Sequence, residues 1–529
     1  MAAPMSWRRL VFSVCSPALA GVVARISDRI FRKHDRRRGS SLLLLAPLLA
    51  EVDAVPARPS SSSEGPHTHF RWMAEHVPVF RVPGTQVHVL HSPDQFYQVM
   101  KARIRTAKRR VVMASLYLGT GTLEQDLVDC MEEALEHSQD QEGRNRLKVT
   151  ILLDYTRGSR DKKNSRTMLL PLLRCFPDQV RVSLYHTPDL RGLLRLLIPQ
   201  RFNETIGVQH IKVYLFDNSV IISGANLSDS YFTNRQDRYV LLDDCEEVAD
   251  FFSDLVGAVG DSSLQLQADN SVQVMEGMVH PYRGNRVDFT TSARERIMGV
   301  VNAARARQHL SGEGDGHGES DTWVFPLVQM KPLGIHVDEQ VTKRLLTEAG
   351  GDSTIYLTSG YFNLTRTYMH VVLGAAADYR ILMASPEVNG FFGAKGVAGA
   401  IPAAYVHLAR KFYSKVCGLG QQERIHLHEY HRPDWTFHAK GLWFYLKGQS
   451  RPCLTLIGSP NFGYRSVHRD LEAQIAIVTE NEDLQAQLHQ EQEMLYKRST
   501  EVSTSTFDRP ERYVKLWVKL VTPLIKNFF

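Results

Sequence analysis

The chain has 529 residues and a formal net charge of +6, and its 43% hydrophobic and 23% charged residues are ordinary for a globular protein, which excludes a disordered or fibrous chain. Because the length exceeds the size at which one hydrophobic core usually stops growing, we expect two lobes. The mild positive charge suits an anionic partner without choosing between a nucleic acid and a membrane, and six scattered cysteines with no CxxC pair indicate a reducing compartment rather than a disulfide framework.

The N-terminal residues have the composition of a targeting segment. Residues 1–27 contain no Asp or Glu but carry Arg8, Arg9 and Arg25 among Ser, Ala, Leu and Val. An acid-poor leader of this kind, able to form an amphipathic helix, is typical of a mitochondrial transit peptide. We place this peptide at residues 1–40; the alternative is a disordered basic tail.

A Pro- and Ser-rich stretch follows the leader at residues 53–67. It predicts a disordered linker, which we extend over residues 41–75. The apolar run Leu42–Ala50 is too short to span a bilayer, and no other stretch reaches the ~20 apolar residues that a spanning helix needs. A lipid substrate would therefore be met from the membrane surface.

The two halves of the remaining chain share an order of predicted elements. In the first half, a β-rich run at 109–117 ends in Ser-Leu-Tyr, and a helical stretch at 123–137 and a buried-strand pattern at 147–154 follow. In the second half, the run at 353–361 ends in Ser-Gly-Tyr, and a helical stretch and a strand at 379–384 follow. This alternation predicts an α/β fold with sheets covered by helices, and the duplication predicts two similar lobes.

These patterns give the expected domain boundaries. We place the first repeat at residues 76–256 and the second at 323–497. The connecting segment, 257–322, includes the polar break 308–321. Residues 498–529 form a basic amphipathic C-terminal segment.

The duplication is sharpest in a polar motif. In each half a His and a Lys two residues apart precede a small-residue turn that ends in Asn, and an acid follows that Asn eleven residues later. The first copy consists of His210, Lys212, Asp217, Asn226 and Asp237, and the second consists of His438, Lys440, Ser459, Asn461 and Glu472. The second copy has Tyr445 at the position of Asp217 and a seven-residue insertion around 447–452.

The spacing of this motif suits phosphate chemistry. Residues two apart in a strand point to the same face, so the His and the Lys are presented together. A turn of small residues lets a phosphate oxygen approach backbone N–H groups and the Asn amide. The acid that follows is able to accept a hydrogen bond from an imidazole and fix its tautomer.

The duplicated motif resembles the HKD signature of the phospholipase D superfamily, over most of residues 80–497. The resemblance implies two similar phospholipase D-like lobes, each a mixed β-sheet flanked by helices, with the active site between them. It also implies that one imidazole attacks phosphorus, the other protonates the leaving oxygen, and a phosphohistidine forms and is then resolved by an alcohol or water. We assign His210 as nucleophile and His438 as general acid, with Lys212, Lys440, Asn226 and Asn461 on the phosphate oxygens.

This chemistry requires no cofactor and no metal. Stimulation by a divalent cation stays open. An ATP site is not supported, because the segment Gly119–Thr122 lacks the Lys-Ser/Thr of a P-loop.

Within that superfamily, the segments QHIKVYLFDN…SGANLS and FHAKGLW…IGSPNFGYRS, together with the leader, resemble the mitochondrial phosphatidylglycerophosphate synthase family. The resemblance implies transfer from CDP-diacylglycerol to sn-glycerol 3-phosphate, which gives phosphatidylglycerophosphate and CMP on the way to phosphatidylglycerol and cardiolipin. It implies no nucleic-acid partner, and a peripheral position on the matrix side of the mitochondrial inner membrane.

Two further features fit an anionic lipid surface. The segments 190–202 and 512–529 mix apolar and basic residues, as interfacial helices do, although both could pack as ordinary helices. Arg235 and Arg469 lie near the two acids and are candidates for the extra phosphates of the substrates; the alternative is local ion pairing.

Three other interpretations remain at this point. The same machinery serves a phosphatidylserine or cardiolipin synthase, because the acceptor pocket cannot be read from the sequence. A nucleic-acid phosphodiesterase would need a basic channel lined by aromatic residues, which the modest charge does not favour. An inactive scaffold is suggested only by Tyr445.

Overall fold

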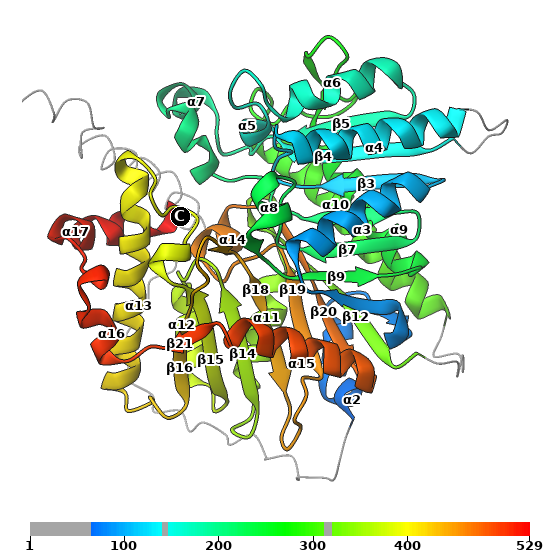
Figure 1. The fold of residues 1–529 in the computed structure, drawn as a ribbon. Helices are drawn as coiled ribbons and strands as arrows, with labels where there is room; N and C mark the ends of the chain where they lie inside the picture. Colours follow the sequence, from blue (N-terminus) through cyan, green and yellow to red (C-terminus); the bar gives the residue numbers. More distant parts are fainter. Residues whose placement is uncertain (1–64, 140–145, 312–319, 529) are drawn as a thin grey trace, which may run out of the picture.

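A computed structural model describes residues 65–139, 146–311 and 320–528. These residues form two mixed sheets flanked by helices, which confirms the predicted α/β class and the two lobes (Figure 1). The predicted transit peptide and most of the predicted linker lie outside the described residues.

The first lobe is built on a nine-stranded sheet. In spatial order its strands are β11 (Val272–Val274), β10 (Leu264–Leu266), β5 (Val180–Tyr185), β4 (Lys148–Asp154), β3 (Arg110–Ala114), β6 (Val213–Phe216), β7 (Ser219–Ser223), β9 (Tyr239–Leu242) and β2 (Val87–Leu90). Strands β3, β4 and β5 run parallel, and β6, β7 and β9 pair antiparallel.

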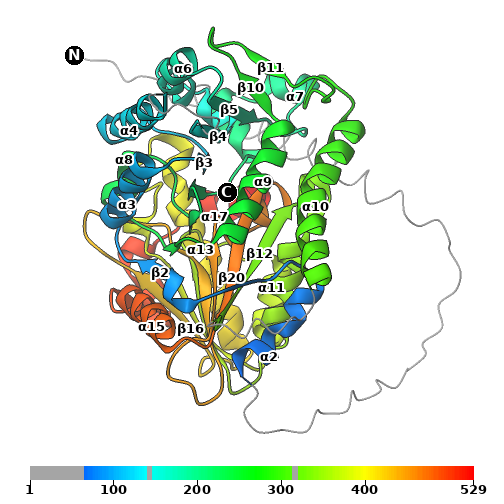
Figure 2. The ribbon, with the colours of Figure 1, turned by 90° about the vertical axis from the view of Figure 1, so that its right-hand side faces the viewer.

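Helices cover both faces of this sheet. Figure 2 shows α3 (Pro93–Thr106) and α4 (Thr122–Gln139) on one side, and α9 (Glu246–Asp261) and α10 (Arg286–Ser311) on the other. Such double coverage explains why β3 and β4 are nearly continuous apolar runs. Local sequence sets the helix starts: Ser92 caps α3 by accepting a hydrogen bond from the Gln95 N–H, and Pro93 occupies its first turn.

The second lobe repeats this topology. In spatial order its strands are β1 (Phe80–Val82), β12 (Thr322–Met330), β20 (Glu472–Thr479), β19 (Leu454–Gly458), β18 (Lys440–Tyr445), β14 (Thr354–Ser359), β15 (Asp378–Ala384), β16 (Ile425–Tyr430) and β21 (Ser499–Glu501), with β13 (Ile335–His336) beside β12. The series β16-β15-β14-β18-β19-β20 matches β5-β4-β3-β6-β7-β9 in order and direction. Helix α15 (Glu482–Tyr496) covers one face, and α11 (Val337–Thr347) and α12 (Arg366–Gly374) lie on the other (Figures 1 and 2).

The two lobes share part of one hydrophobic core. A single buried cluster contains Val112 and Ile211 from the first lobe and Val328 and Ile475 from the second. The lobes are therefore packed into one body, and their relative position is fixed by apolar burial. None of the helices in the described ranges is long and apolar enough to cross a membrane.

Several predicted boundaries need correction. Residues 66–75 belong to α2 (Pro66–Phe70) and a 3₁₀ helix rather than to a linker, because Phe70 and Met73 are buried in the second lobe. Strand β1, expected in the first repeat, pairs with β12 of the second lobe. Strands β10 and β11, expected in the connecting segment, extend the first sheet, and β21, expected in the C-terminal segment, extends the second.

Candidate active site

The two His-x-Lys segments meet where the lobes join. The first segment immediately precedes the central strand β6, and the second leads into the central strand β18, which begins at Lys440. A two-stranded parallel sheet of β8 (Arg235–Gln236) and β17 (Thr436–Phe437) connects the lobes there. The His438 N–H donates to the Gln236 carbonyl at 2.8 Å, and the His210 N–H donates to the Leu471 carbonyl at 2.8 Å. The backbone of each histidine is therefore held by the other repeat.

Each imidazole is also paired with the acid of the opposite repeat. Nδ1 of His210 lies 2.8 Å from Oε2 of Glu472, and Nδ1 of His438 lies 2.6 Å from Oδ2 of Asp237. Both acids and His438 are buried, and the His210 side chain is 13% exposed. The carboxylates orient both rings through Nδ1, which directs Nε2 of each ring towards the substrate; Nε2 of His438 also lies 3.4 Å from the Tyr231 hydroxyl. The sequence predicted both acids but could not assign each to its histidine.

Two buried lysines complete the cluster. Nζ of Lys212 donates to the His210 carbonyl at 2.8 Å, and Nζ of Lys440 donates to the His438 carbonyl at 2.6 Å. Burial lowers the pKa of Lys440 and lowers that of Lys212 well below its ordinary value, although Glu472 and Asp237 oppose the shift. Buried ammonium groups of this kind are stabilised by an anionic ligand such as phosphate.

The two His–acid pairs differ electrostatically. Burial lowers the pKa of His210, and Glu472 acts against that shift. The pKa of His438 is well below its ordinary value, because burial is reinforced by Lys440, Arg235 and Lys212. Although burial acts to raise it, the pKa of Glu472 is about 2 because of His210 and Lys212, whereas burial raises the pKa of Asp237. The site without ligand therefore favours a neutral His438.

The Asn turns are hydrogen-bonded to the Ser-x-Tyr segments at the C-terminal ends of β3 and β14. Oδ1 of Asn226 accepts hydrogen bonds from the Leu116 N–H (3.3 Å) and the Ser115 hydroxyl (3.4 Å). Oδ1 of Asn461 accepts from the Ser359 hydroxyl at 3.3 Å. The hydroxyl of Ser459 donates to Glu472.

Three tyrosines at the site were not predicted as functional residues. Tyr231 and Tyr361 place their rings edge-on to the His438 imidazole, with centroids 5.2 and 5.6 Å away. Tyr117 lies under the guanidinium of Arg157, which is 3.8 Å from the ring centroid. The repeated Ser-x-Tyr segments were the signal that could have found Tyr117 and Tyr361.

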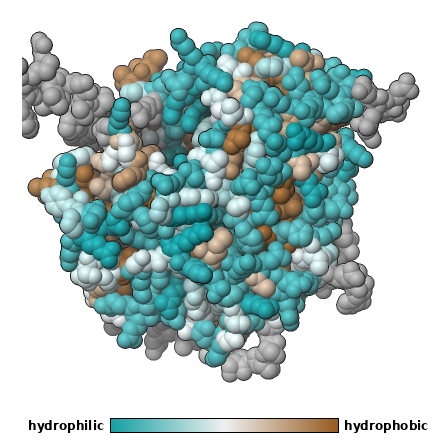
Figure 3. Space-filling model, viewed as in Figure 1, coloured by the Kyte–Doolittle hydropathy of each residue, from teal (hydrophilic) through white to brown (hydrophobic). Residues whose placement is uncertain are grey.

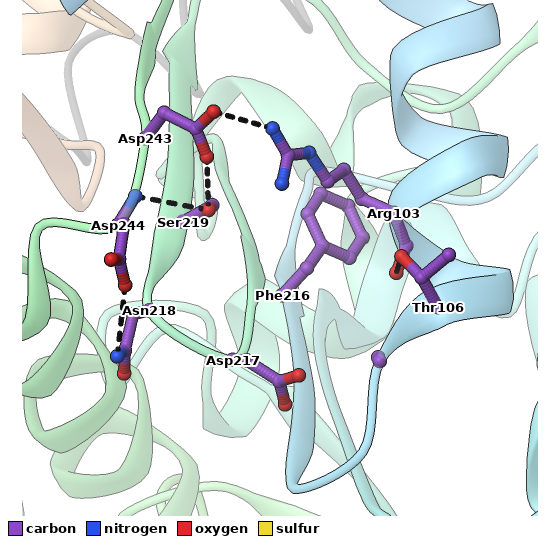
Figure 4. Close-up of a pocket in the computed structure, with 9 residues that line it drawn as sticks. Arg103, Thr106, Phe216, Asp217, Asn218, Ser219, Asp243 and Asp244 are labelled. Atoms are coloured by element: carbon purple, nitrogen blue, oxygen red, sulfur yellow. Dashed lines mark hydrogen bonds and ion pairs between the residues drawn. The ribbon is translucent and has the colours of Figure 1, made fainter. Parts of the chain in front are cut away.

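The structure does not bring Asp217 to this cluster. Asp217 lies in the hairpin turn between β6 and β7, at the end of β6 away from His210. Figure 4 shows it lining a surface pocket with Arg103 and Asn218. Its carboxylate accepts hydrogen bonds from the backbone N–H groups of residues 108–110, and its φ is +52°. The expected catalytic role is therefore corrected to a structural role in the hairpin.

The same geometry accounts for Tyr445. Tyr445 ends β18, away from His438, and its hydroxyl contacts His489 (2.9 Å) and Gln492 (3.1 Å). Because this position is structural in both repeats, the exchange of Asp for Tyr leaves the His438 site intact. Tyr445 was the only sequence feature that suggested an inactive scaffold, and its position does not support that interpretation.

The two candidate arginines occupy different places. Arg235 lies beside His438, with Nη1 3.0 Å from the Tyr231 hydroxyl. Arg469 donates to the Thr205 carbonyl at 2.6 Å, and its guanidinium lies 4.1 Å from the centroid of the Phe528 ring. Arg469 therefore links peripheral segments, whereas Arg235 belongs to the histidine cluster.

This arrangement is suited to displacement at phosphorus. Two imidazoles lie close enough for the charge of one to act on the other. Each imidazole is hydrogen-bonded to a carboxylate, and two buried ammonium groups lie beside them. An imidazole can form a covalent bond to phosphorus while the second imidazole transfers a proton, and the lysines stabilise the charge on the non-bridging oxygens.

Comparison with known proteins identifies close relatives. The chain is 64% identical to the mitochondrial CDP-diacylglycerol–glycerol-3-phosphate 3-phosphatidyltransferase of Homo sapiens, over 100% of this chain and 99% of the relative. It is 33% identical to the CDP-diacylglycerol–glycerol-3-phosphate 3-phosphatidyltransferase of Saccharomyces cerevisiae, over 84% of this chain and 88% of the relative. No protein-family model matches.

A solved structure supports the fold. The crystal structure of phosphatidylserine synthase from Haemophilus influenzae aligns with a TM-score of 0.65 at 20% sequence identity, over 88% of this chain and 100% of that chain. At this identity the likeness extends to the arrangement of the two lobes only.

Proposed function

We propose how the site works from one premise: the chain belongs to the family of mitochondrial CDP-diacylglycerol–glycerol-3-phosphate 3-phosphatidyltransferases. The enzyme transfers the phosphatidyl group of CDP-diacylglycerol to glycerol 3-phosphate and makes phosphatidylglycerophosphate for the synthesis of phosphatidylglycerol and cardiolipin. CMP is the product that leaves. The observation that carries the mechanism is the crossed pairing of His210 with Glu472 and of His438 with Asp237.

In the first step, Nε2 of His210 attacks the phosphorus atom next to the diacylglycerol. A P–N bond forms, the P–O bond to CMP breaks, and the departing oxygen takes a proton from His438. Lys212 and Lys440 stabilise the charge on the non-bridging oxygens, and Asn226 and Asn461 border the same site.

In the second step, the primary hydroxyl of glycerol 3-phosphate gives its proton to His438 and attacks the same phosphorus. The P–N bond breaks, His210 is released, and phosphatidylglycerophosphate forms. This second displacement regenerates the protonated His438 that the next cycle needs.

The mechanism requires a cationic His438 when the donor is bound. Burial, Lys440 and Arg235 lower the pKa of His438 in the protein alone. The negative diphosphate of CDP-diacylglycerol offsets these two cations, so we expect His438 to take up its proton as the donor binds.

We also propose that the enzyme meets its lipid from the membrane surface. Two groups of exposed apolar side chains support this: Leu193, Leu196 and Leu197 on α7 (Gly192–Leu197), and Leu516, Leu520 and Leu524 on α17 (Leu516–Ile525). Figure 3 shows brown, apolar residues over both helices. Exposed Lys515 and Lys519 lie beside the second group, as expected at an anionic lipid surface.

Both apolar helices adjoin the segment that precedes Glu472. Arg465 donates to the carbonyl of Glu204, which follows α7, and Arg469 packs on Phe528, which follows α17. A membrane touching the two helices would hold the diacylglycerol beside the histidine cluster. We place this contact on the matrix side of the mitochondrial inner membrane, and we propose that the partner is lipid and not nucleic acid.

Trapping the intermediate tests the mechanism. Purified protein is incubated with CDP-diacylglycerol labelled at the phosphatidyl phosphate and quenched, and the label on protein is located by mass spectrometry. We expect label on His210 in the wild type and none in His210→Ala. Label on His438 instead would overturn the assignment of roles, and absence of CMP release with glycerol 3-phosphate would overturn the activity.

A further inference from the structure

The electrostatic balance differs between the two sides of the histidine cluster. Arg235 lies nine residues after Asn226, and the matching residue of the second repeat, nine after Asn461, is Asp470. Asp470 forms an ion pair with Arg465, in which Nη2 of Arg465 lies 3.2 Å from Oδ2 of Asp470. The positive charge of Arg465, on the His210 side of the cluster, is therefore neutralised by a carboxylate of the protein itself.

Arg235 has no such partner. No carboxylate of the described residues lies within 4.0 Å of its guanidinium, and its Nε is buried without a hydrogen bond. The guanidinium lies 4.4 Å from the centroid of the Tyr231 ring, and Arg235 as a whole residue is of intermediate exposure. An arginine that is partly removed from solvent and has no carboxylate partner is destabilising unless a ligand supplies the negative charge.

The surroundings of Arg235 point to an anion that binds next to His438. The Tyr231 hydroxyl accepts hydrogen bonds from Arg235 (3.0 Å) and Asn226 (3.0 Å), and it lies 3.4 Å from Nε2 of His438. A Cβ atom at Gly390 would lie 2.8 Å from the Tyr361 hydroxyl and 3.8 Å from both terminal nitrogens of Arg235. Glycine at this position keeps side-chain atoms away from the guanidinium and from the Tyr361 hydroxyl, which has no hydrogen-bond partner among the described residues.

The reaction places a second phosphate on this side. The acceptor must approach phosphorus from the face opposite the P–N bond to His210, where its hydroxyl can give a proton to His438. The phosphomonoester of glycerol 3-phosphate, three carbons away from that hydroxyl, then lies near His438. We propose that Arg235, with the Tyr361 hydroxyl, binds this phosphomonoester and thereby selects glycerol 3-phosphate over uncharged acceptors.

This inference rests on the proposed function. Binding of a phosphomonoester at this position favours Arg over Lys. A guanidinium presents two parallel N–H donors to a phosphate, whereas an ammonium acts as a point charge. The alternative ligand of Arg235 is the phosphate of the departing CMP. The test must therefore separate the acceptor step from the donor step.

Partitioning of the phosphatidyl-enzyme separates these two steps. Wild type, Arg235→Gln and Arg235→Lys receive labelled CDP-diacylglycerol in micelles together with glycerol 3-phosphate and excess glycerol. The ratio of phosphatidylglycerophosphate to phosphatidylglycerol plus phosphatidate is measured. All of these products form from the same phosphatidyl-enzyme, after the P–N bond has formed. A change in the rate of the donor step therefore does not alter their ratio. The first-turnover rate of CMP release with glycerol alone reports the donor step.

We expect the product ratio to fall about 30–100-fold in Arg235→Gln, as for loss of a charged hydrogen-bonded pair, and less in Arg235→Lys. CMP release with glycerol alone should fall by a much smaller factor than the product ratio, because Arg235 acts on the donor step only through His438. Tyr361→Phe, which keeps the ring packed, should lower the ratio a few-fold and serves if Arg235→Gln does not fold. Arg103→Gln, which removes a surface arginine paired with Asp243, is the control and should not change the ratio.

An unchanged ratio in Arg235→Gln and Tyr361→Phe would overturn the inference while leaving the proposed function intact. An equal loss of CMP release with both acceptors would assign Arg235 to the donor and would also overturn it. A wild-type protein that releases no CMP with any acceptor would overturn the proposed function and this inference together.

Discussion

The carboxylate of Asp237 lies 2.6 Å from Nδ1 of His438, although the two residues belong to different repeats. Glu472 and His210 repeat the arrangement in the opposite direction, at 2.8 Å. Neither lobe alone contains a complete His–acid pair. The catalytic cluster therefore exists only when the lobes are docked, and the shared hydrophobic core contributes to activity by holding that docking.

Removing the charge of Asp237 should impair proton transfer by His438 while the imidazole itself stays in place. In Asp237→Asn the imidazole loses the carboxylate that orients it and stabilises its cation, so we expect kcat to fall about 100-fold or more. CMP release under saturating substrates measures the effect. Asp243→Asn, which alters a surface carboxylate of the same lobe, is the control. Wild-type kcat in Asp237→Asn would contradict the crossed pairing.

The sequence predicted the elements of the fold more completely than the pairing within the site. The strand pattern at 147–154 became β4, and that at 379–384 became β15, because both are continuous apolar runs covered by helices. The acids follow their Asn residues by the same offset in both copies, so spacing alone could not decide which histidine each acid would meet. That decision depends on the pairing of β8 with β17 between the lobes.

The interpretation of Asp217 was wrong for a reason that the sequence already contained. Asp217 lies five residues after Lys212, which is roughly 17 Å along an extended strand. A residue so far along the strand cannot contact the phosphate that the His and the Lys bind.

Loss of the Asp217 carboxylate should affect stability and not catalysis. Asp217→Ala leaves the backbone N–H groups of residues 108–110 without this acceptor and puts Ala at a φ of +52°. We expect unfolding free energy to fall by about 1–3 kcal/mol, with kcat of the folded protein unchanged. Asp217→Asn, which keeps one acceptor oxygen and tolerates this φ, should lose less. Urea unfolding and CMP release measure the two quantities. A large drop in kcat at wild-type stability would restore the catalytic interpretation.

The exposed leucines of α7 and α17 should contribute to membrane binding. Leu196 is 79% exposed and Leu520 is 66% exposed, so replacing both by Gln removes apolar surface that the fold does not use. We expect partitioning onto anionic vesicles to weaken about 30-fold, from roughly 1 kcal/mol for each side chain. Activity on a soluble short-chain CDP-diacylglycerol should persist.

Leu419→Gln is the matched control for this experiment. Leu419 is 54% exposed, but it follows α13 (Ile401–Gly418) and precedes β16, at the end of the second sheet away from the histidines. Vesicle binding should be unchanged. Equal losses in the control and in the double variant would argue against a membrane face at α7 and α17.

Acid should destabilise the protein partly through His186. Burial lowers the pKa of His186 to about 4, whereas in the unfolded chain it is near 6.5. Between these values the unfolded state binds a proton that the folded state does not. The stability contribution is therefore intact above pH 6.5 and is lost as the pH falls towards 4, by up to roughly 3 kcal/mol. His186→Gln should flatten the pH dependence of urea unfolding between pH 7 and 4.5; an identical dependence in both proteins would be incompatible with a buried neutral His186.

Gly224 and Ser459 occupy the same position in the two repeats, two residues before Asn226 and Asn461, but only one of them has room for a side chain. A Cβ atom at Gly224 would lie 2.6 Å from Oδ1 of Asp237 and 2.7 Å from Nζ of Lys440. Gly224→Ala should therefore displace the carboxylate from His438, and we expect kcat to fall at least about 10-fold.

Two variants separate this displacement from a general effect of adding or removing a Cβ atom. Gly257→Ala, in helix α9 with open space around its Cβ position, should keep wild-type kcat and gain up to about 1 kcal/mol of stability. Ser459→Gly removes a CH2OH group whose hydroxyl contacts Glu472 and the backbone of Ala473 but no histidine, so its effect on kcat should be a few-fold. If Gly224→Ala retained wild-type kcat, Asp237 would not need its observed position, and the pairing that organises the site would have to be reassigned.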